Sequence, residues 1–168
     1  GNGALVAALR TALDREPDII VGKPEPALFT TAAQRVGSLR PLVIGDRLDT
    51  DIEGAGRADM DSLLVLTGVS TAQDLLLAPP QRRPTYVAAD LSGLFEVDGV
   101  VRLDGDGAQP RQTGWTLVGD PPQLTGDGTL LEALAVLCAT AWARPGVRIA
   151  AGSDRACAAL RELALPGS

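Results

Sequence analysis

The chain has 168 residues, of which 45% are hydrophobic and 21% are charged, and its formal net charge is −6. This composition is typical of a folded globular protein and excludes a disordered one. The acidic balance argues against a surface for nucleic acid or an anionic membrane, so any phosphate group would bind at a local site. No apolar run in the sequence approaches the roughly 20 residues of a membrane span, so we predict no such span.

Cysteine, histidine and lysine usage narrows the possible chemistry. The two cysteines, Cys138 and Cys157, are too few for a disulfide scaffold and indicate buried thiols in a reducing cytoplasm. The absence of histidine excludes serine–histidine–aspartate catalysis and histidine metal sites within the chain. Lys23 is the single lysine beside 14 arginines, which makes it a candidate for a position that requires a compact ammonium group.

Elements of the first half alternate between apolar runs and helical periods. An amphipathic helix is expected over 5–13, with Leu5, Leu9 and Leu13 on its buried face. Short buried strands are expected at 19–21, 41–44, 62–66 and 83–87. The intervening helices are expected over 27–36, 52–57 and 70–77, followed by a helical turn over 91–95. This alternation predicts a parallel sheet with covering helices.

Two of these helices have sequence signatures at their N-termini. Thr50 and Glu53 have the spacing of a capping box, and so do Ser70 and Gln73. The helix over 27–36 is expected to stop at Gly37.

The second half has a different character. Residues 98–127 are rich in Gly, Asp and Pro, and we expect a hairpin of strands 100–103 and 115–118 joined through 104–107. Thr129 predicts the capped start of a long helix, 147–150 predicts a strand, and Ser153 predicts the cap of a final helix to Leu163. We therefore predict two units, an α/β unit over 1–96 and a small α+β extension over 97–168, whose core is marginal unless it docks on something.

The acidic stretch after the second predicted strand is the candidate site. Asp46 follows a buried strand directly, and Asp51 begins the next helix. Magnesium prefers carboxylate and water oxygens, and phosphoryl transfer needs a hard cation and a positive side chain in fixed positions. Lys23 follows the preceding strand and would reach the same crevice if the two strands are neighbours. Asp49 is expected to be only a solvated or capping carboxylate.

Two motifs resemble those of a known superfamily. Gly22-Lys23-Pro24-Glu25-Pro26 and Gly45-Asp46-Arg47-Leu48-Asp49-Thr50-Asp51-Ile52 resemble the third and fourth motifs of haloacid dehalogenase (HAD) superfamily phosphatases. The residues of these two motifs are most similar to those of members with a large α/β (C2) cap. This is the group of NagD and of the phosphoglycolate and 4-nitrophenyl phosphatases. Segments 1–4, 66–69 and 83–91 also resemble that group. The resemblance implies an α/β fold, namely the carboxyl half of a Rossmann-like HAD core.

The resemblance also implies roles for three residues. Lys23 would stabilise the nucleophilic aspartate and the transferring phosphoryl group, Asp46 would be a Mg²⁺ ligand, and Asp51 would hold the metal shell. The family's nucleophilic aspartate and its cap have no counterpart in this sequence. We therefore expect the chain alone to be inactive and to need the missing N-terminal half of the same protein as its partner.

The last 70 or so residues resemble the short acetyltransferase-like extension of some actinobacterial members, especially those similar to glycerol 3-phosphate phosphatase. We expect packing or homodimer contact from this extension, not acetyl transfer. The resemblance implies a Mg²⁺-dependent phosphatase of a small phosphorylated metabolite, with glycerol 3-phosphate as the first candidate and phosphoglycolate as the second.

A second interpretation stays open. Asp46 taken alone is more typical of a turn aspartate that bonds its own backbone. In that case the chain would be a non-catalytic α/β regulatory or docking domain with a relic acidic site.

Overall fold

A four-stranded sheet is the centre of the first half of the protein. The structure is a computed structural model that describes residues 2–104 and 113–166. The sheet has the order β1 (Leu42–Gly45), β2 (Asp61–Val65), β3 (Tyr86–Ala88) and β4 (Val100–Arg102). The first three strands are parallel and β4 is antiparallel to β3. Parallel strands need crossover connections, and the helices between them supply these.

The helices around this sheet are short. They are α2 (Ala27–Arg35), the π-helix η1 (Leu48–Ile52), α3 (Glu53–Arg57), α4 (Ala72–Leu76) and the 3-10 helices η2 (Pro80–Arg82) and η3 (Leu91–Phe95). Ser62 to Val65 of β2 are all buried, since β2 has a neighbouring strand on each side and helices over its faces. The predicted parallel sheet with covering helices is present. Helix α2 ends at Arg35, and the predicted stop residue, Gly37, follows in the left-handed region (φ 62°).

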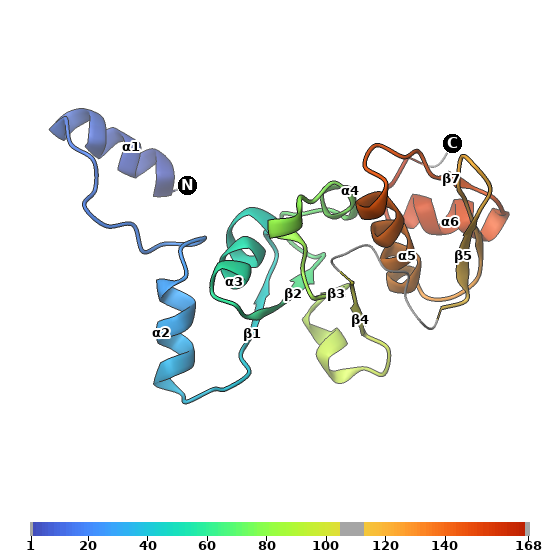
Figure 1. Ribbon diagram of the computed structural model, residues 1–168, viewed down its shortest axis with the longest axis horizontal. Helices are drawn as coiled ribbons and strands as arrows, with labels where there is room; N and C mark the ends of the chain where they lie inside the picture. The colour runs from blue at the N-terminus through green and yellow to red at the C-terminus, as the bar shows by residue number, and fades with distance from the viewer. Residues whose placement is uncertain (1, 105–112, 167–168) are drawn as a thin grey trace.

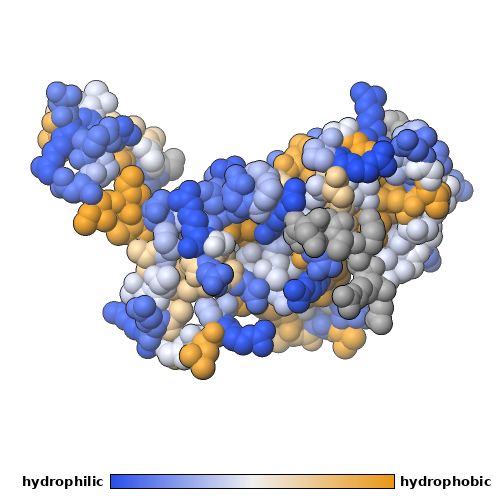
Figure 2. Space-filling model, in the orientation of Figure 1, coloured by the Kyte–Doolittle hydropathy of each residue, from blue (hydrophilic) through white to orange (hydrophobic). Residues whose placement is uncertain are grey.

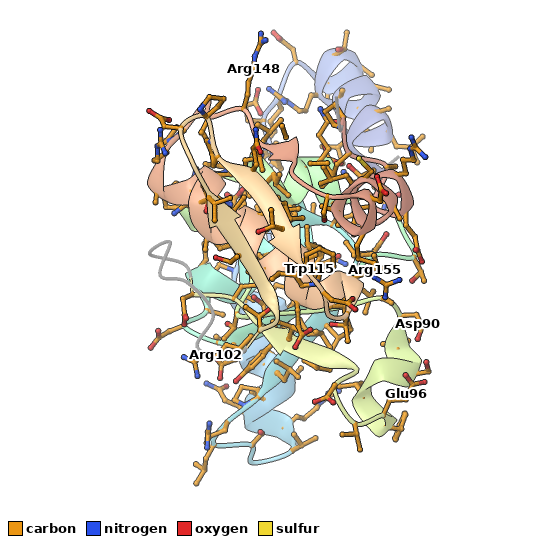
Figure 3. All side chains as sticks on the ribbon, turned by 90° about the vertical axis from the view of Figure 1, so that its right-hand side faces the viewer. Asp90, Glu96, Arg102, Trp115, Arg148 and Arg155 are labelled. Atoms are coloured by element: carbon orange, nitrogen blue, oxygen red, sulfur yellow. The ribbon has the colours of Figure 1, made fainter. Side chains whose placement is uncertain are left out.

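A second sheet and two helices make up the end of the chain. The sheet has the order β5 (Trp115–Val118), β6 (Gln123–Gly126) and β7 (Ala150–Ala151). It packs on α5 (Leu130–Ala143) and α6 (Asp154–Glu162), as Figure 3 shows. Thr129 forms the predicted capping box with Glu132, and Ser153 caps α6 as predicted.

One continuous core joins the two sheets. Leu64 and Val87 of the first sheet belong to the same buried cluster as Leu134 and Trp142 of α5. The Trp142 indole Nε1 donates a hydrogen bond to the backbone oxygen of Leu75 at 3.1 Å. The small core of the extension is therefore enlarged by docking against α4, which compensates for the marginal size expected of such a unit.

The predicted hairpin over 100–103 and 115–118 is wrong. Val101 of β4 pairs with Val87 of β3, whereas β5 pairs with β6 in the other sheet. The proposed connecting turn, 104–107, lies mostly outside the described residues. Strand β4 joins the first sheet because the edge of β3 would otherwise leave its backbone N–H and C=O groups unpaired. The pairing also places Val101 opposite the apolar Val87.

Residues before Lys23 do not pack as the sequence predicts. Helix α1 (Asn2–Leu13) forms, but its leucines are exposed and it has no buried residue. Residues 19–21 form no strand, and Ile19 is 78% exposed. Figure 1 shows α1 standing apart from the rest of the chain, and Figure 2 shows apolar surface on it and on the segment that follows. A strand needs a neighbour for its backbone groups, and none of the described strands lies beside 19–21.

The outer edge of β1 is also open in the described structure, since β1 ends the sheet. Leu42 and Ile44 on this strand remain 41% and 39% exposed. No helix in the described part of the chain is both long and apolar enough to cross a membrane.

Candidate active site

Asp46 lies directly after β1, and the loop that follows β2 holds it. Its Oδ2 accepts a hydrogen bond from the backbone N–H of Val69 at 2.9 Å, and its carbonyl oxygen accepts one from Ser70 N–H, also at 2.9 Å. Gly68 permits this approach, because a Cβ there would lie 2.1 Å from Asp46 Oδ2. No residue in the described ranges donates a hydrogen bond to Oδ1, so that oxygen remains available to a ligand.

Asp51 is buried under the same loop. It lies in η1 with 5% of its surface exposed. Its Oδ1 pairs with Lys23 Nζ at 2.6 Å, and its Oδ2 accepts the backbone N–H of Arg47 at 3.1 Å. A Cβ on Gly45 would lie 2.3 Å from Asp51 Cβ, so glycine is needed where β1 ends. Both carboxylate oxygens of Asp51 thus accept hydrogen bonds from the protein, whereas only Oδ2 of the Asp46 carboxylate does so in the described part of the chain.

The segment that carries Lys23 is anchored to α3. Arg57 of α3 pairs with Glu25 at 2.6 Å, two residues after Lys23. A Cβ on Gly54 would lie 2.5 Å from the Phe29 ring and 3.2 Å from the Pro24 carbonyl oxygen. These contacts bring Lys23 to Asp51 across 28 residues of sequence, although 19–21 provides no neighbouring strand.

Glu53 completes this anchor, and sequence reasoning assigned it a different role. Its carboxylate pairs with Arg57 at 2.5 Å and with Arg82 of η2 at 2.8 Å. The two guanidinium groups, Arg82 first, hold the pKa of Glu53 below its ordinary value of 4.5. The predicted Thr50–Glu53 capping box is wrong, because α3 continues from η1 and leaves no free helix start at Thr50. The Thr50 hydroxyl is buried without a hydrogen-bond partner among the described residues.

Asp49 turns away from the other two carboxylates. It accepts two hydrogen bonds from the Arg47 guanidinium, at 3.0 and 2.8 Å. That guanidinium lowers the pKa of Asp49, and Asp49 in turn raises the pKa of Arg47. The carboxylate is therefore neutralised locally.

The loop between β2 and α4 was the part of the site that sequence reasoning missed. The predicted Ser70–Gln73 capping box is wrong, because Thr71 and Asp74 form it one residue later. Ser70 Oγ instead accepts the backbone N–H of Leu48 at 3.0 Å. The sequence did contain a signal for this helix start, because Thr71 precedes Asp74 by three residues. This is the spacing of a capping box, with aspartate in the place of glutamate or glutamine.

The arrangement places two carboxylates and one ammonium group near the end of β1. Within the described residues, no group of three or more carboxylate, cysteine or histidine side chains lies close enough to hold a metal ion. Asp46 and Asp51 lie at the carboxyl end of β1, which is where open α/β sheets bind ligands. The chain thus brings together Asp46, Asp51 and Lys23, and further oxygen ligands would have to come from water, substrate or another segment.

Comparison with known proteins defines the family. Residues 20–94 match the family model described as HAD-hydrolase-like. This match confirms the predicted resemblance to HAD-superfamily hydrolases and their α/β fold.

Within this family the chain is similar to phosphatases. It is 41% identical over 186 residues to D-glycerol 3-phosphate phosphatase of Mycobacterium tuberculosis, covering 98% of this chain and 50% of that protein. It is 37% identical over 99 residues to phosphoglycolate phosphatase 2 of Arabidopsis thaliana, covering 58% of this chain and 33% of the other.

A solved structure has the same fold over nearly the whole chain. The crystal structure of a glycerol phosphate phosphatase from M. tuberculosis in complex with magnesium matches with a TM-score of 0.80 and 43% identity, over 99% of this chain and 50% of that one. The chain thus spans about half the length of the M. tuberculosis relative and a third of the A. thaliana one.

Proposed function

We propose that this chain is the carboxyl half of a Mg²⁺-dependent phosphomonoester hydrolase. The observation that carries the proposal is the ion pair between Lys23 Nζ and Asp51 Oδ1 at 2.6 Å, next to the loop that holds Asp46. This is the spatial arrangement that the two family motifs imply. It places one positive and two negative side chains at one end of a parallel sheet, where a phosphoryl group and a cation would both be held.

Each of the three residues has a distinct proposed role. Asp46 would ligate Mg²⁺ through Oδ1, since Oδ2 already accepts the Val69 N–H. Asp51 would orient Lys23 and support the metal's water shell, because both of its oxygens already accept protein hydrogen bonds. Lys23 would hold the nucleophile and the phosphoryl oxygens by its positive charge. When bound, Mg²⁺ would supply Lewis-acid stabilisation of the charge on the phosphoryl oxygens.

The fit of Mg²⁺ to this chain rests on the donor set. Magnesium usually takes one or two protein carboxylates and keeps several waters. Asp46 offers an oxygen with no donor from the described residues, and the lack of a side chain at Gly68 lets the carboxylate lie against the loop after β2. A calcium complex of the M. tuberculosis phosphatase has also been solved, with a TM-score of 0.81 to this chain.

The reacting half of the site would come from the missing N-terminal half of the same protein. The open edge of β1, with Leu42 and Ile44 partly exposed, is suited to receive another strand. The exposed apolar residues at 19–21 and on α1 would be covered by the same half. We infer that the 168-residue chain alone is inactive.

The substrate is proposed to be a small phosphorylated metabolite. Glycerol 3-phosphate is the first candidate, because 98% of the chain is similar to a phosphatase that is named for this substrate. Phosphoglycolate is the second candidate.

We also propose that the complete protein is a homodimer and is cytoplasmic. Sedimentation equilibrium tests the dimer, and a monomer mass for the complete protein would contradict it.

Hydrolysis of the two substrates tests the activity. The complete polypeptide should release phosphate from glycerol 3-phosphate with Mg²⁺ and lose this activity in EDTA, whereas the 168-residue chain should release none. Asp46→Asn and Lys23→Ala in the complete polypeptide should each lower kcat by about 10²-fold or more.

Asp49→Asn is the matched control, because Asp49 is already neutralised by Arg47 and should matter much less. Activity that survives Asp46→Asn undiminished would refute the role of Asp46. A complete polypeptide that hydrolyses neither ester would favour the regulatory or docking interpretation.

A further inference from the structure

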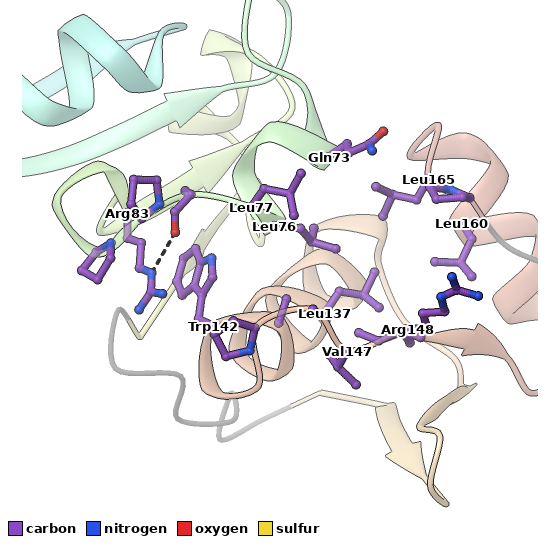
Figure 4. Close-up of a pocket in the computed structure, with 18 residues that line it drawn as sticks. Gln73, Leu76, Leu77, Arg83, Leu137, Trp142, Val147, Arg148, Leu160 and Leu165 are labelled. Carbon is purple, nitrogen blue, oxygen red and sulfur yellow. Dashed lines mark hydrogen bonds between the residues drawn. The ribbon is translucent and has the colours of Figure 1, made fainter.

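A cavity of about 710 Å³ lies between α4 and the carboxyl-terminal extension. One wall is formed by α4 and the turn that follows it, and the other by α5, the loop 145–149 and α6 (Figure 4). The volume is in the range of small-molecule sites, which run from about 300 to 1,000 Å³. Lys23, Asp46 and Asp51 do not line it, so it is distinct from the candidate active site.

The body of the cavity is apolar. Leu76 and Leu77 contribute from the α4 side, and Leu137, Trp142 and Val147 contribute from the extension. Leu77 is 72% exposed although it faces this concave surface. Apolar side chains left in contact with water inside a cavity of this size are typical of a ligand site, because a ligand removes them from water.

The charged groups of the lining are all positive among the described residues. Arg83 and Arg148 line the cavity, and none of the described aspartates and glutamates does. Figure 4 shows Trp142, beside Arg83, at one end of the lining, with Leu76, Leu77 and Leu137 between it and Arg148. The Arg83 guanidinium lies 4.8 Å from the centre of the Trp142 ring, and its Nε donates to the Ala78 carbonyl oxygen.

Arg148 is the cation that is open to a ligand. Its side chain is exposed at the rim, and it forms no ion pair or hydrogen bond with any other described residue. Arg83, by contrast, is held in place by Ala78 and Trp142 and helps to make its end of the cavity unfavourable for a cation.

We propose that this cavity binds a small amphipathic anion. The alkyl or aryl body of the ligand lies against Leu76, Leu77 and Trp142, and its carboxylate or phosphate head lies at the rim beside Arg148. A guanidinium pairs favourably with either head group. This inference does not depend on the proposed phosphatase activity, and its test uses binding alone.

The test is isothermal titration calorimetry on the 168-residue chain with three probes below their micelle-forming concentrations. Decanoate and decyl phosphate carry the two candidate head groups, and decyltrimethylammonium carries the same alkyl chain with a positive head. We expect both anions to bind, the tighter of the two identifying the head group, and the cation to bind at least about tenfold more weakly.

Two matched pairs of variants locate the site. Arg148→Leu should weaken decanoate about fivefold, which corresponds to an exposed charge pair of about 1 kcal/mol, whereas Arg161→Leu on the exposed surface of α6 should not. Leu77→Gln should also weaken decanoate, whereas Leu13→Gln should not. Leu77 and Leu13 are 72% and 68% exposed, so both substitutions are tolerated by folding and both remove equivalent apolar surface.

Three results would overturn the proposal. The first is no heat from either anion at about 1 mM at two temperatures, because burial of the alkyl chain makes the binding enthalpy depend on temperature. The second is decyltrimethylammonium binding as tightly as decanoate. The third is an equal loss for Leu13→Gln and Leu77→Gln, because binding would then be non-specific adsorption to exposed apolar surface.

Discussion

Replacing Gly45 by alanine tests whether the end of β1 is shaped around Asp51. The added Cβ would lie 2.3 Å from Asp51 Cβ and 2.5 Å from its Oδ2. Asp51 is 95% buried and held by Lys23 and by the Arg47 N–H, so it cannot move aside freely. Overpacking costs about 1–3 kcal/mol, and a carboxylate displaced from its donors costs about 1–3 kcal/mol more. We expect Gly45→Ala to lower the free energy of unfolding by about 2–6 kcal/mol.

Urea denaturation followed by circular dichroism measures this change. With a slope near 2 kcal/mol/M, the midpoint should fall by about 1–3 M. Gly56→Ala is the matched control, since its Cβ would meet only the Gln81 carbonyl oxygen at 3.7 Å and alanine favours the helix.

A double-mutant cycle gives the decisive comparison. In an Asp51→Gly background the opposing Cβ is gone, so Gly45→Ala should cost much less than in the wild type. An equal cost in the two backgrounds would refute the packing explanation.

Three further predictions concern ionisation, capping and thiol reactivity. Arg82 lowers the pKa of Glu53, so the folded protein binds fewer protons at this carboxylate than the unfolded protein does. Glu53→Gln should therefore destabilise the protein by about 1–3 kcal/mol at pH 7. The difference in stability between the variant and the wild type should vanish as the pH falls through and below 4.5. Thr71→Ala should cost about 1 kcal/mol in urea denaturation, because it removes the cap of α4. Burial raises the pKa of the Cys138 thiol, so a thiol reagent at neutral pH should modify Cys157 first and Cys138 only on unfolding.

The first two of these predictions have controls on the exposed surface. Glu162→Gln should destabilise the protein much less than Glu53→Gln at pH 7, since Glu162 is exposed on α6. Thr31→Ala on α2 should cost less than Thr71→Ala, because Thr31 caps no helix. Rapid modification of Cys138 in the folded protein would contradict its burial.

Local patterns predicted the elements that depend on near neighbours in the chain. The apolar run before Gly45 predicted β1, and the Thr129–Glu132 spacing predicted the start of α5. The prediction that Asp49 is a bystander agrees with its pairing to Arg47, two residues away. These features are set within a few residues, where the geometry of a turn, a strand or a helix cap decides the outcome.

Competition between neighbouring residues was harder to predict. Ser70 and Thr71 both fit a capping box, and the structure uses Thr71 because Ser70 Oγ is taken by the Leu48 N–H. Thr50 lost its predicted cap because η1 runs directly into α3. For Ser70, a contact with Leu48, 22 residues away, outweighed a local preference of about 1 kcal/mol.

By itself, the sequence determined the α/β pattern, the family motifs and the three candidate residues Lys23, Asp46 and Asp51. Only the tertiary structure decided which oxygens of those carboxylates are committed, that β4 pairs with β3, and that 19–21 stays unpaired. It alone placed Arg83 and Arg148 around one apolar cavity, 65 residues apart in the chain. The physical reason is that strand pairing, close approach to glycine and cavity formation depend on groups distant in sequence, which no local pattern encodes.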